Sequence, residues 1–288
     1  MRLFRLPTIG LLLMSCTAFA QPDPLRSWEA LYEQTLKVNE SKALALLQQK
    51  YRALPIGYEK LYMSSKLYNF MNKRNQPFHG SSNLFNNDYK QREDKFIQAL
   101  NLENELNFKE AIEIYMQLLA EARQIGSLKG QELLSYQLCR SVNKQGHYYQ
   151  ASLHCNELEK LLSEQDYTLL PKYKSLRVIA NNYEFIGDYQ GALATYRKLL
   201  EVTPTYRDPS GTYNDVGLLL KRMSQLEQSS NFLNKALELR KANGTPLELA
   251  QTYHSLGDLM ISSRNTKQAL NILIALIQFL NNTTICTG

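Results

Sequence analysis

The sequence has few of the residues from which catalytic and metal sites are built. It contains 4 histidines and 4 cysteines in 288 residues. It has no phosphate-binding loop, no nucleophile elbow and no zinc-protease helix. His147, His154 and Cys155 are close in sequence, but His154 and Cys155 would point about 100° apart on a helix, and His147 lies two turns away. We therefore expect no catalytic residue, no metal site and no cofactor, and hence no enzyme.

The charge balance is too even to indicate a nucleic-acid partner. Lys and Arg number 33 against 27 Asp and Glu, which gives a net charge of +6. Removing the two arginines in residues 1–20 lowers this from +6 to +4. A nucleic-acid-binding domain normally carries a stronger basic excess. We therefore expect no nucleic-acid partner.

The first twenty residues resemble an export signal. A basic start and an apolar run over residues 8–17 precede an Ala-Phe-Ala sequence that ends at Ala20. The run is too short to span a bilayer. We expect cleavage after Ala20 and a periplasmic or secreted protein. The alternative is a lipoprotein anchored at Cys16, because Leu-Met-Ser-Cys at residues 13–16 resembles a lipobox.

One spacing pattern recurs along most of the chain, and its clearest copy runs from Tyr173 to Tyr206. If Tyr173 is position 1, positions 4, 7, 8 and 11 share one face of a first helix, and positions 20, 24 and 27 share one face of a second. These positions hold Leu176, Ile179, Ala180, Tyr183, Ala192, Tyr196 and Leu199. Gly187 and Asp188 separate the helices, since glycine can end one helix and aspartate can cap the next.

Further copies start near Arg92, Glu132, Ser210 and Ala250, about 37 to 41 residues apart. The pattern resembles the tetratricopeptide repeat (TPR), a helix–turn–helix unit of about 34 residues. This resemblance implies an all-α fold, an α-solenoid of stacked antiparallel helix pairs. Small residues at positions 8 and 20 would let the two helices of a pair touch. Proteins built from this repeat bind other proteins or peptides.

The rest of the chain divides around this array. Residues 21–91 indicate a helical region that is only loosely repeat-like, with a turn near Asn39, a helix from Gly57 to about Met71, and an exposed polar connection over residues 72–87. Residues 92–280 form the array and 281–288 a tail. Residues 270–280 are apolar nearly all round, so we expect this helix to dock on a membrane or partner, unless a further element covers it.

Two of the cysteines fall on facing helices of one copy. Cys139 is at position 8 and Cys155 at position 24 of the copy that starts at Glu132. They can be two small buried apolar residues, the interpretation that the sequence favours, or a disulfide formed in an oxidising compartment. A disulfide requires Cα atoms within about 7 Å.

The resemblance also places a ligand site. In TPR proteins, positions 2, 5, 9, 12 and 13 of the first helices line the concave face. The residues of this chain at such positions that we select as candidate ligand-binding residues are Tyr136, Arg140, Asn143, Lys144, Lys174, Arg177, Asn181, Asn214, Lys221, Arg222 and His254. Their mixture suits an acidic or carboxylate-bearing peptide, and a solvated face without a ligand is the alternative.

Two narrower resemblances differ in what they imply. Arg177 and Asn181 match part of the carboxylate clamp of chaperone-binding members, but Asp215, Gln251 and Ser255 depart from it, so we do not expect chaperone-tail binding. The order of signal, helical lead-in and repeats resembles the periplasmic sensor region of bacterial diguanylate cyclase-type signalling proteins. We expect a non-catalytic periplasmic binding scaffold, with a truncated sensor that lacks its transmembrane and catalytic parts as the alternative.

The export signal makes a direct prediction. The mature protein should start at Gln21 and be soluble outside the cytoplasm, because a signal peptidase cleaves after the small residue that ends the signal. Intact-mass measurement of the exported protein checks this. A mass that retains Met1, or that includes a lipid on Cys16, would contradict it.

Overall fold

The computed structural model describes residues 24–78, 87–164, 168–204, 207–264, 270–272 and 274. This part of the chain contains twelve named α-helices and no β-strand. The helices are α1 (Pro24–Val38), α2 (Glu40–Ala53), α3 (Tyr58–Asn72), α4 (Asn87–Asn104), α5 (Phe108–Gln124), α6 (Leu128–Lys144), α7 (Tyr148–Glu164), α8 (Lys172–Phe185), α9 (Tyr189–Val202), α10 (Ser210–Arg222), α11 (Leu226–Asn243) and α12 (Pro246–Ser262). The export signal, the tail and most of residues 270–280 lie outside the described residues.

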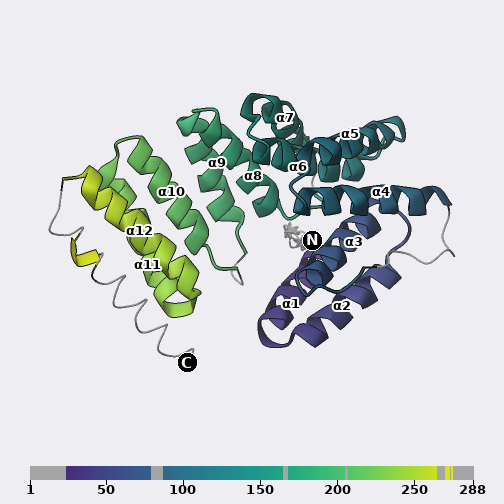
Figure 1. The fold of residues 1–288 in the computed structure, drawn as a ribbon, viewed down its shortest axis with the longest axis horizontal. Coiled ribbons are helices and arrows are strands. Elements are labelled where there is room, and N and C mark those ends of the chain that lie inside the picture. The colour runs from purple at the N-terminus through teal and green to yellow at the C-terminus, as the bar shows by residue number, and fades with distance from the viewer. Residues whose placement is uncertain are drawn as a thin grey trace, which may run out of the picture.

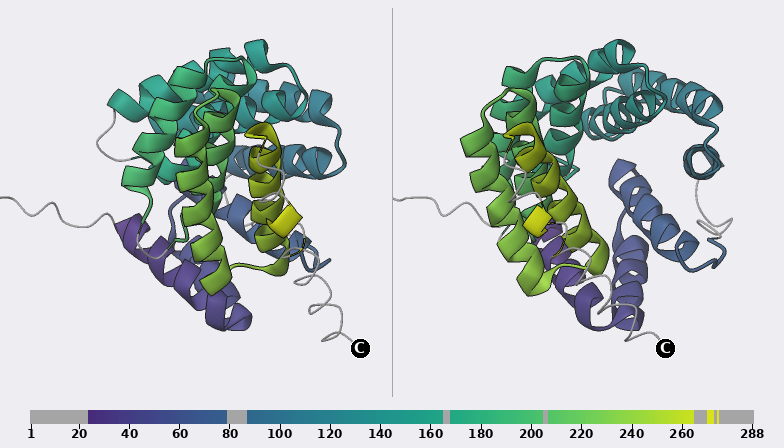
Figure 2. Two further views of the ribbon diagram at one scale, coloured as in Figure 1. Left: turned by 90° about the vertical axis from the view of Figure 1, so that its left-hand side faces the viewer. Right: turned by 60° about the vertical axis from the view of Figure 1, so that its left-hand side comes forward.

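From α4 onward the helices form antiparallel pairs that stack along a curved array (Figure 1). The pairs are α4 with α5, α6 with α7, α8 with α9, and α10 with α11, and α12 begins the next copy. The first helices α6 and α8 contact each other, as do α10 and α12. Consecutive second helices have no comparable contact among the described residues. This places the first helices on the inner side of the curve (Figure 2), and the predicted α-solenoid is confirmed.

The turn inside each pair has the same backbone conformation. Gly146 and Gly187 have φ values of 88° and 85°. A Cβ added at either glycine would have no neighbour within 4 Å, so the left-handed conformation, not lack of space, favours glycine there. The equivalent turns place Leu106, Ser224 and Arg264 at φ values of 65°, 60° and 57°. These residues accept a strained conformation to keep the turn that the repeat requires.

The two helices of a pair touch where the repeat pattern predicts small residues. Ala180 at position 8 and Ala192 at position 20 have no exposed surface. In the copy that starts at Ser210, the same positions hold Gly217 and Ser229. A Cβ on Gly217 would lie 2.6 Å from Leu233 Cγ, and Ser229 Oγ donates a hydrogen bond of 2.7 Å to the Gly217 carbonyl. The remaining pairs of positions, Ala99 with Ala111 and Cys139 with Ala151, are also fully buried.

The amino-terminal helices turn back beneath the first copies of the array (Figure 1). The predicted turn is at Asn39, whose side chain accepts a hydrogen bond from the Lys42 amide at 2.9 Å and caps α2. The predicted helix after Gly57 is α3, which contacts both α4 and α6. The polar connection predicted over residues 72–87 falls partly outside the described residues.

The helix contact at positions 8 and 20 can be tested by mutation. Ala192→Arg should lower the free energy of unfolding by about 4 kcal/mol or more, because a buried guanidinium without a partner cannot fit between two touching helices. Gln190→Arg, two residues away at an exposed position of α9, is the matched control and should change stability by less than about 0.5 kcal/mol. Denaturant unfolding measures both. Equal midpoints for the two variants would contradict the register of the repeat.

Candidate functional site

The inner face of the array is formed by α6, α8, α10 and α12, and the predicted ligand-binding residues lie on these four helices. Asn143 and Asn214 are buried, whereas Lys144, Arg222 and His254 are exposed. The remaining candidates are partly exposed: Tyr136, Arg140, Lys174, Arg177, Asn181 and Lys221. A ligand on this face would therefore meet a row of partly exposed polar side chains rather than a deep pocket.

Most of the cations on this face are already paired with carboxylates of neighbouring copies. Arg177 Nη1 lies 3.0 Å from Asp215 Oδ2, which links α8 to α10. In the same way Arg140 pairs with Glu103 of α4, Lys221 with Asp258 of α12, and Arg222 with Glu184 of α8. We call these four ion pairs the inner-face ladder. The sequence interpretation did not include these pairs, and ligand binding by the four cations stays a prediction.

The carboxylates of the ladder could have been found in the sequence. Each lies 37 or 38 residues from its cation, which is one repeat away. Residues at similar positions of successive first helices are neighbours in a solenoid, so opposite charges about one repeat apart indicate a cross-repeat ion pair. The burial of the Asp215 carboxyl could not be predicted from this spacing. Burial raises the pKa of its carboxyl to about 6, although the adjacent Arg177 opposes the shift.

Two inner-face lysines have no ion-pair partner among the described residues. Burial, with repulsion by Arg140, lowers the pKa of Lys144, whose Nζ lies 5.9 Å from the centroid of the Phe108 ring. Lys174 Nζ donates one hydrogen bond of 3.3 Å to the Tyr62 hydroxyl. A ligand that binds these two lysines would not have to break an ion pair among the described residues, as it would at the four paired cations.

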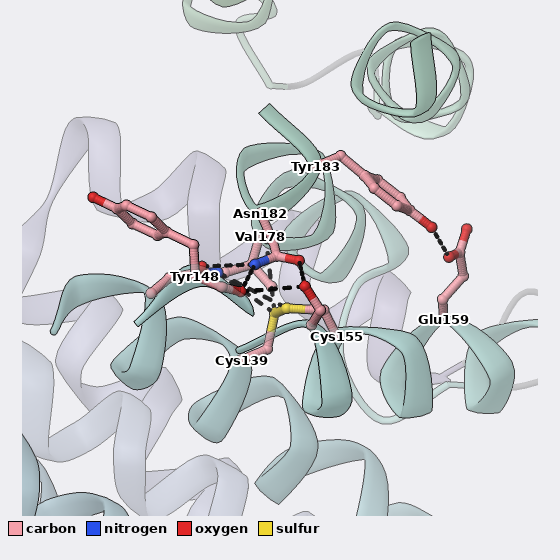
Figure 3. Close-up of a disulfide and its surroundings, with 9 residues drawn as sticks. Cys139, Tyr148, Cys155, Glu159, Val178, Asn182 and Tyr183 are labelled. Carbon is pink, nitrogen blue, oxygen red and sulfur yellow. Dashed lines mark hydrogen bonds between the residues drawn. A yellow bond between two sulfur atoms is a disulfide. The ribbon is translucent and has the colours of Figure 1, made fainter. Parts of the chain in front are cut away.

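A disulfide fixes α6 to α7 just behind this face (Figure 3). Cys139 and Cys155 are bonded, with Cα atoms 5.0 Å apart. The favoured interpretation of two unpaired cysteines is therefore wrong. The small contact at Cys139 and Ala151 brings the helices close enough for the bond. Asn182 of α8 continues the connection, since its Nδ2 donates to Asn143 Oδ1 at 2.9 Å and to the Tyr148 carbonyl at 2.8 Å.

Two clefts were not predicted from the sequence. One, of about 720 Å³, lies among α7, α8 and α9 and is lined by none of the candidate residues. The other, of about 500 Å³, is lined by residues of α1, α2 and α3, by Lys73 and Arg74 just after α3, and by Lys174 of α8. We call it the α1–α3–α8 cleft. Within the described residues, no group of His, Cys, Asp or Glu is placed to hold a metal ion, and no helix is long and apolar enough to cross a membrane.

The family comparison agrees with this geometry. Residues 174–206 and 210–243 match the family model described as tetratricopeptide repeat. These two segments are similar to the tetratricopeptide repeat. The two matched segments cover α8 with α9 and α10 with α11, the copies predicted to start at Tyr173 and Ser210. No curated protein sequence matches the chain.

Solved structures show the same fold at low sequence identity. The nearly identical TPR-like repeats of a candidate kinesin light chain from Podosopora anserina align with a TM-score of 0.57 and 12% identity, over 67% of this chain and 96% of that chain. The apo form of RapI aligns with a TM-score of 0.59 and 14% identity, over 67% of this chain and 72% of that chain. BtubC (BKLC) from P. vanneervenii aligns with a TM-score of 0.57 and 14% identity, over 91% of this chain and 93% of that chain. None of these findings bears on the diguanylate cyclase sensor resemblance, which stays a prediction.

The disulfide should contribute measurably to stability. Replacing both cysteines, Cys139→Ala with Cys155→Ala, should lower the free energy of unfolding by about 3 kcal/mol, because the bond closes a loop between residues 16 apart in sequence. Denaturant unfolding with and without a reductant measures this. The reductant should lower the midpoint of the wild type and leave that of the double variant unchanged. An equal effect of reductant on both proteins would contradict the pairing.

Proposed function

We propose that this protein is a non-catalytic scaffold that binds a protein or peptide along the inner face of its first helices. The repeats support this class of function, since tetratricopeptide repeats commonly bind proteins or peptides. The observation that carries the proposal is the inner-face ladder. Its ion pairs hold long side chains in fixed positions across neighbouring copies, so less conformational entropy is lost when a ligand is bound.

The ladder also limits the chemistry of the ligand. Its cations and carboxylates neutralise each other pair by pair, so the face as a whole does not attract a strongly charged partner. Lys144 and Lys174 add local positive charge at the α6 and α8 end of the face. We therefore expect an acidic or carboxylate-bearing segment of the ligand to bind there, and polar or uncharged residues to follow along α10 and α12.

We further propose that the protein acts outside the cytoplasm, in the periplasm or as a secreted protein. The export signal motivates this, and the Cys139–Cys155 bond supports it, because structural disulfides persist mainly in oxidising compartments. Membrane association through a lipidated Cys16 or the apolar carboxyl-terminal segment is the alternative location.

A second candidate function is the sensor portion of a membrane-bound signalling protein of the diguanylate cyclase type. The observation that favours it lies at the end of the array, where Leu247, Ile261 and Leu270 are 69%, 63% and 58% exposed. Exposed apolar side chains at both ends of α12 and beyond it suit contact with a further protein element or a membrane surface.

Charge reversal on the inner face tests the scaffold proposal. Lys144→Glu with Arg222→Glu changes two exposed residues of α6 and α10 and breaks the Arg222–Glu184 ion pair, so thermal unfolding first shows that the variant is folded. We expect at least about a tenfold loss of affinity for a partner captured from a periplasmic extract, and weaker capture by the wild type as salt is added. Quantitative pull-down at several salt concentrations measures this.

The matched control is Arg197→Glu with Lys198→Glu, which makes the same change in charge at two exposed residues of the second helix α9. This variant should bind within about twofold of the wild type, as expected for charges away from the interface. If the control loses the partner and the inner-face variant keeps it, the binding face has been placed on the wrong side of the array.

A further inference from the structure

The α1–α3–α8 cleft joins the amino-terminal helices to the inner face of the array. It has a volume of about 500 Å³ and is lined on the side of α1 and α3 by aromatic residues that include Tyr32 and Phe70. Its cations are Lys66, Lys73, Arg74 and Lys174, and its carboxylates are Glu33 and Glu40. The lining thus combines apolar rings with an excess of two positive charges, a composition that suits an organic anion.

Two of the cations have well-formed partners. Lys66 Nζ lies 2.8 Å from Glu29 Oε1 and within 5.8 Å of the ring centroids of Trp28, Tyr32 and Tyr62. Arg74 Nε donates to Glu40 Oε2 at 3.0 Å, beside α2. Both cations are therefore explained by the packing of α1, α2 and α3 against each other.

Lys174 is held in a position that disfavours its own charge. It is the third residue of α8, where the helix dipole disfavours a cation and favours an anion. It is partly buried, and its hydrogen-bond partner among the described residues is a neutral phenol, the Tyr62 hydroxyl. Its ammonium lies 5.7 Å from the Tyr62 ring, which also contacts Lys66 at 5.3 Å. Two cations therefore approach one ring, and no carboxylate of the described residues pairs with Lys174.

The surrounding charges agree with this description. Burial, together with repulsion by Lys66 and Arg207, lowers the pKa of Lys174 to about 7, and Glu29 and Glu33 only partly oppose the shift. A methionine or leucine would fill the same space without this cost. A charged group retained where it destabilises the fold is a candidate for ligand binding.

We propose that Lys174, with Lys66 beside it, binds a carboxylate group of a ligand that occupies the α1–α3–α8 cleft. A carboxylate would supply the negative partner that Lys174 lacks and would also be stabilised by the amino-terminal end of α8. The carboxylates of Glu33 and Glu40 at the cleft disfavour a doubly charged group such as phosphate, so a single negative charge fits better. This proposal rests on the proposed function and assigns the acidic end of the bound peptide to this cleft.

The proposal implies a specific pH dependence. Only the protonated ammonium attracts a carboxylate, and Lys174 loses its proton near pH 7 in the free protein. The affinity should therefore be highest between about pH 5, where a carboxylate remains ionised, and pH 7. Above pH 7 it should fall by about tenfold per pH unit until the pKa of the bound state is reached. Binding should raise the pKa of Lys174, so the complex takes up a proton at pH 8.

The experiment uses the full mature chain and two hexapeptide pools of the same mixed composition, one with free carboxyl termini and one amidated. Sodium acetate is the small-carboxylate probe. The lysines are labelled by reductive ¹³C-methylation, and the NMR signal of Lys174 is assigned by its absence in Lys174→Arg. Titration calorimetry at pH 6.5 and 8.5 gives affinities. Lys174→Met removes the charge, and Lys172→Met, an exposed lysine in the same turn of α8, is the matched control.

The expected result is that the free-carboxyl pool shifts the Lys174 signal and raises its pKa, whereas the amidated pool does neither. Lys174→Met should lose at least about tenfold in affinity at pH 6.5 and Lys172→Met less than about twofold. Lys174→Arg should still bind but without the decline above pH 7, because a guanidinium keeps its proton. Acetate that competes with the peptides at equal carboxylate concentration would support the site and assign it to small organic acids.

Equal binding of both pools, or an unchanged affinity of a folded Lys174→Met, would overturn the proposal. Thermal unfolding of each variant shows whether it is folded. If Lys174→Met does not fold, the pH dependence of binding by Lys174→Arg tests the proposal instead. The two proposals fail separately. If Lys144→Glu with Arg222→Glu abolishes partner capture while Lys174→Met leaves it intact, the scaffold proposal stands and the cleft proposal is wrong.

Discussion

The contact between the two helices of each pair, at positions 8 and 20, is the constraint on which the rest of the structure depends. Ala180 and Ala192 have no exposed surface, and Gly217 leaves no room for a Cβ against Leu233. Close helices bring Cys139 and Cys155 within bonding distance. They also fix the direction of each first helix, and hence the spacing at which Arg177 meets Asp215 one copy later. The geometry of the inner face is therefore determined by a buried contact between small residues.

The contact between the two helices of a pair could be predicted from the sequence because the same pattern of small residues recurs in several copies. A single alanine carries little information, but small residues at the same two positions of successive copies exclude other helix arrangements. The turn at Gly187 was predictable for the same reason, and the structure places Leu106 and Ser224 at the equivalent turns with positive φ. The helices around Asn39 and Gly57 followed from local turn and capping signals alone.

The candidate site was less predictable, because its chemistry depends on contacts between copies. Position numbers placed Arg140 and Lys221 on the inner face, and the carboxylates that face them become apparent only when charges about one repeat apart are compared across copies. The disulfide depended on a distance that helix spacing alone did not fix. The α1–α3–α8 cleft lay beyond any repeat pattern, since it exists only because α3 turns back toward α8, more than a hundred residues further along the chain.

The basic residues of the inner face fall into two groups, those that pair with a carboxylate of a neighbouring copy and those that do not. Cations that pair across copies stabilise one arrangement of neighbouring first helices, and removing either partner would leave a partly buried charge. Lys174 does not belong to that set, because its partner is a phenol of the amino-terminal helices rather than a carboxylate of the next copy. The unfavourable free energy of placing its ammonium there destabilises the contact between α3 and the array. A ligand carboxylate bound there would contact both parts of the molecule, so the docking of α1–α3 and the binding of the ligand should be thermodynamically coupled.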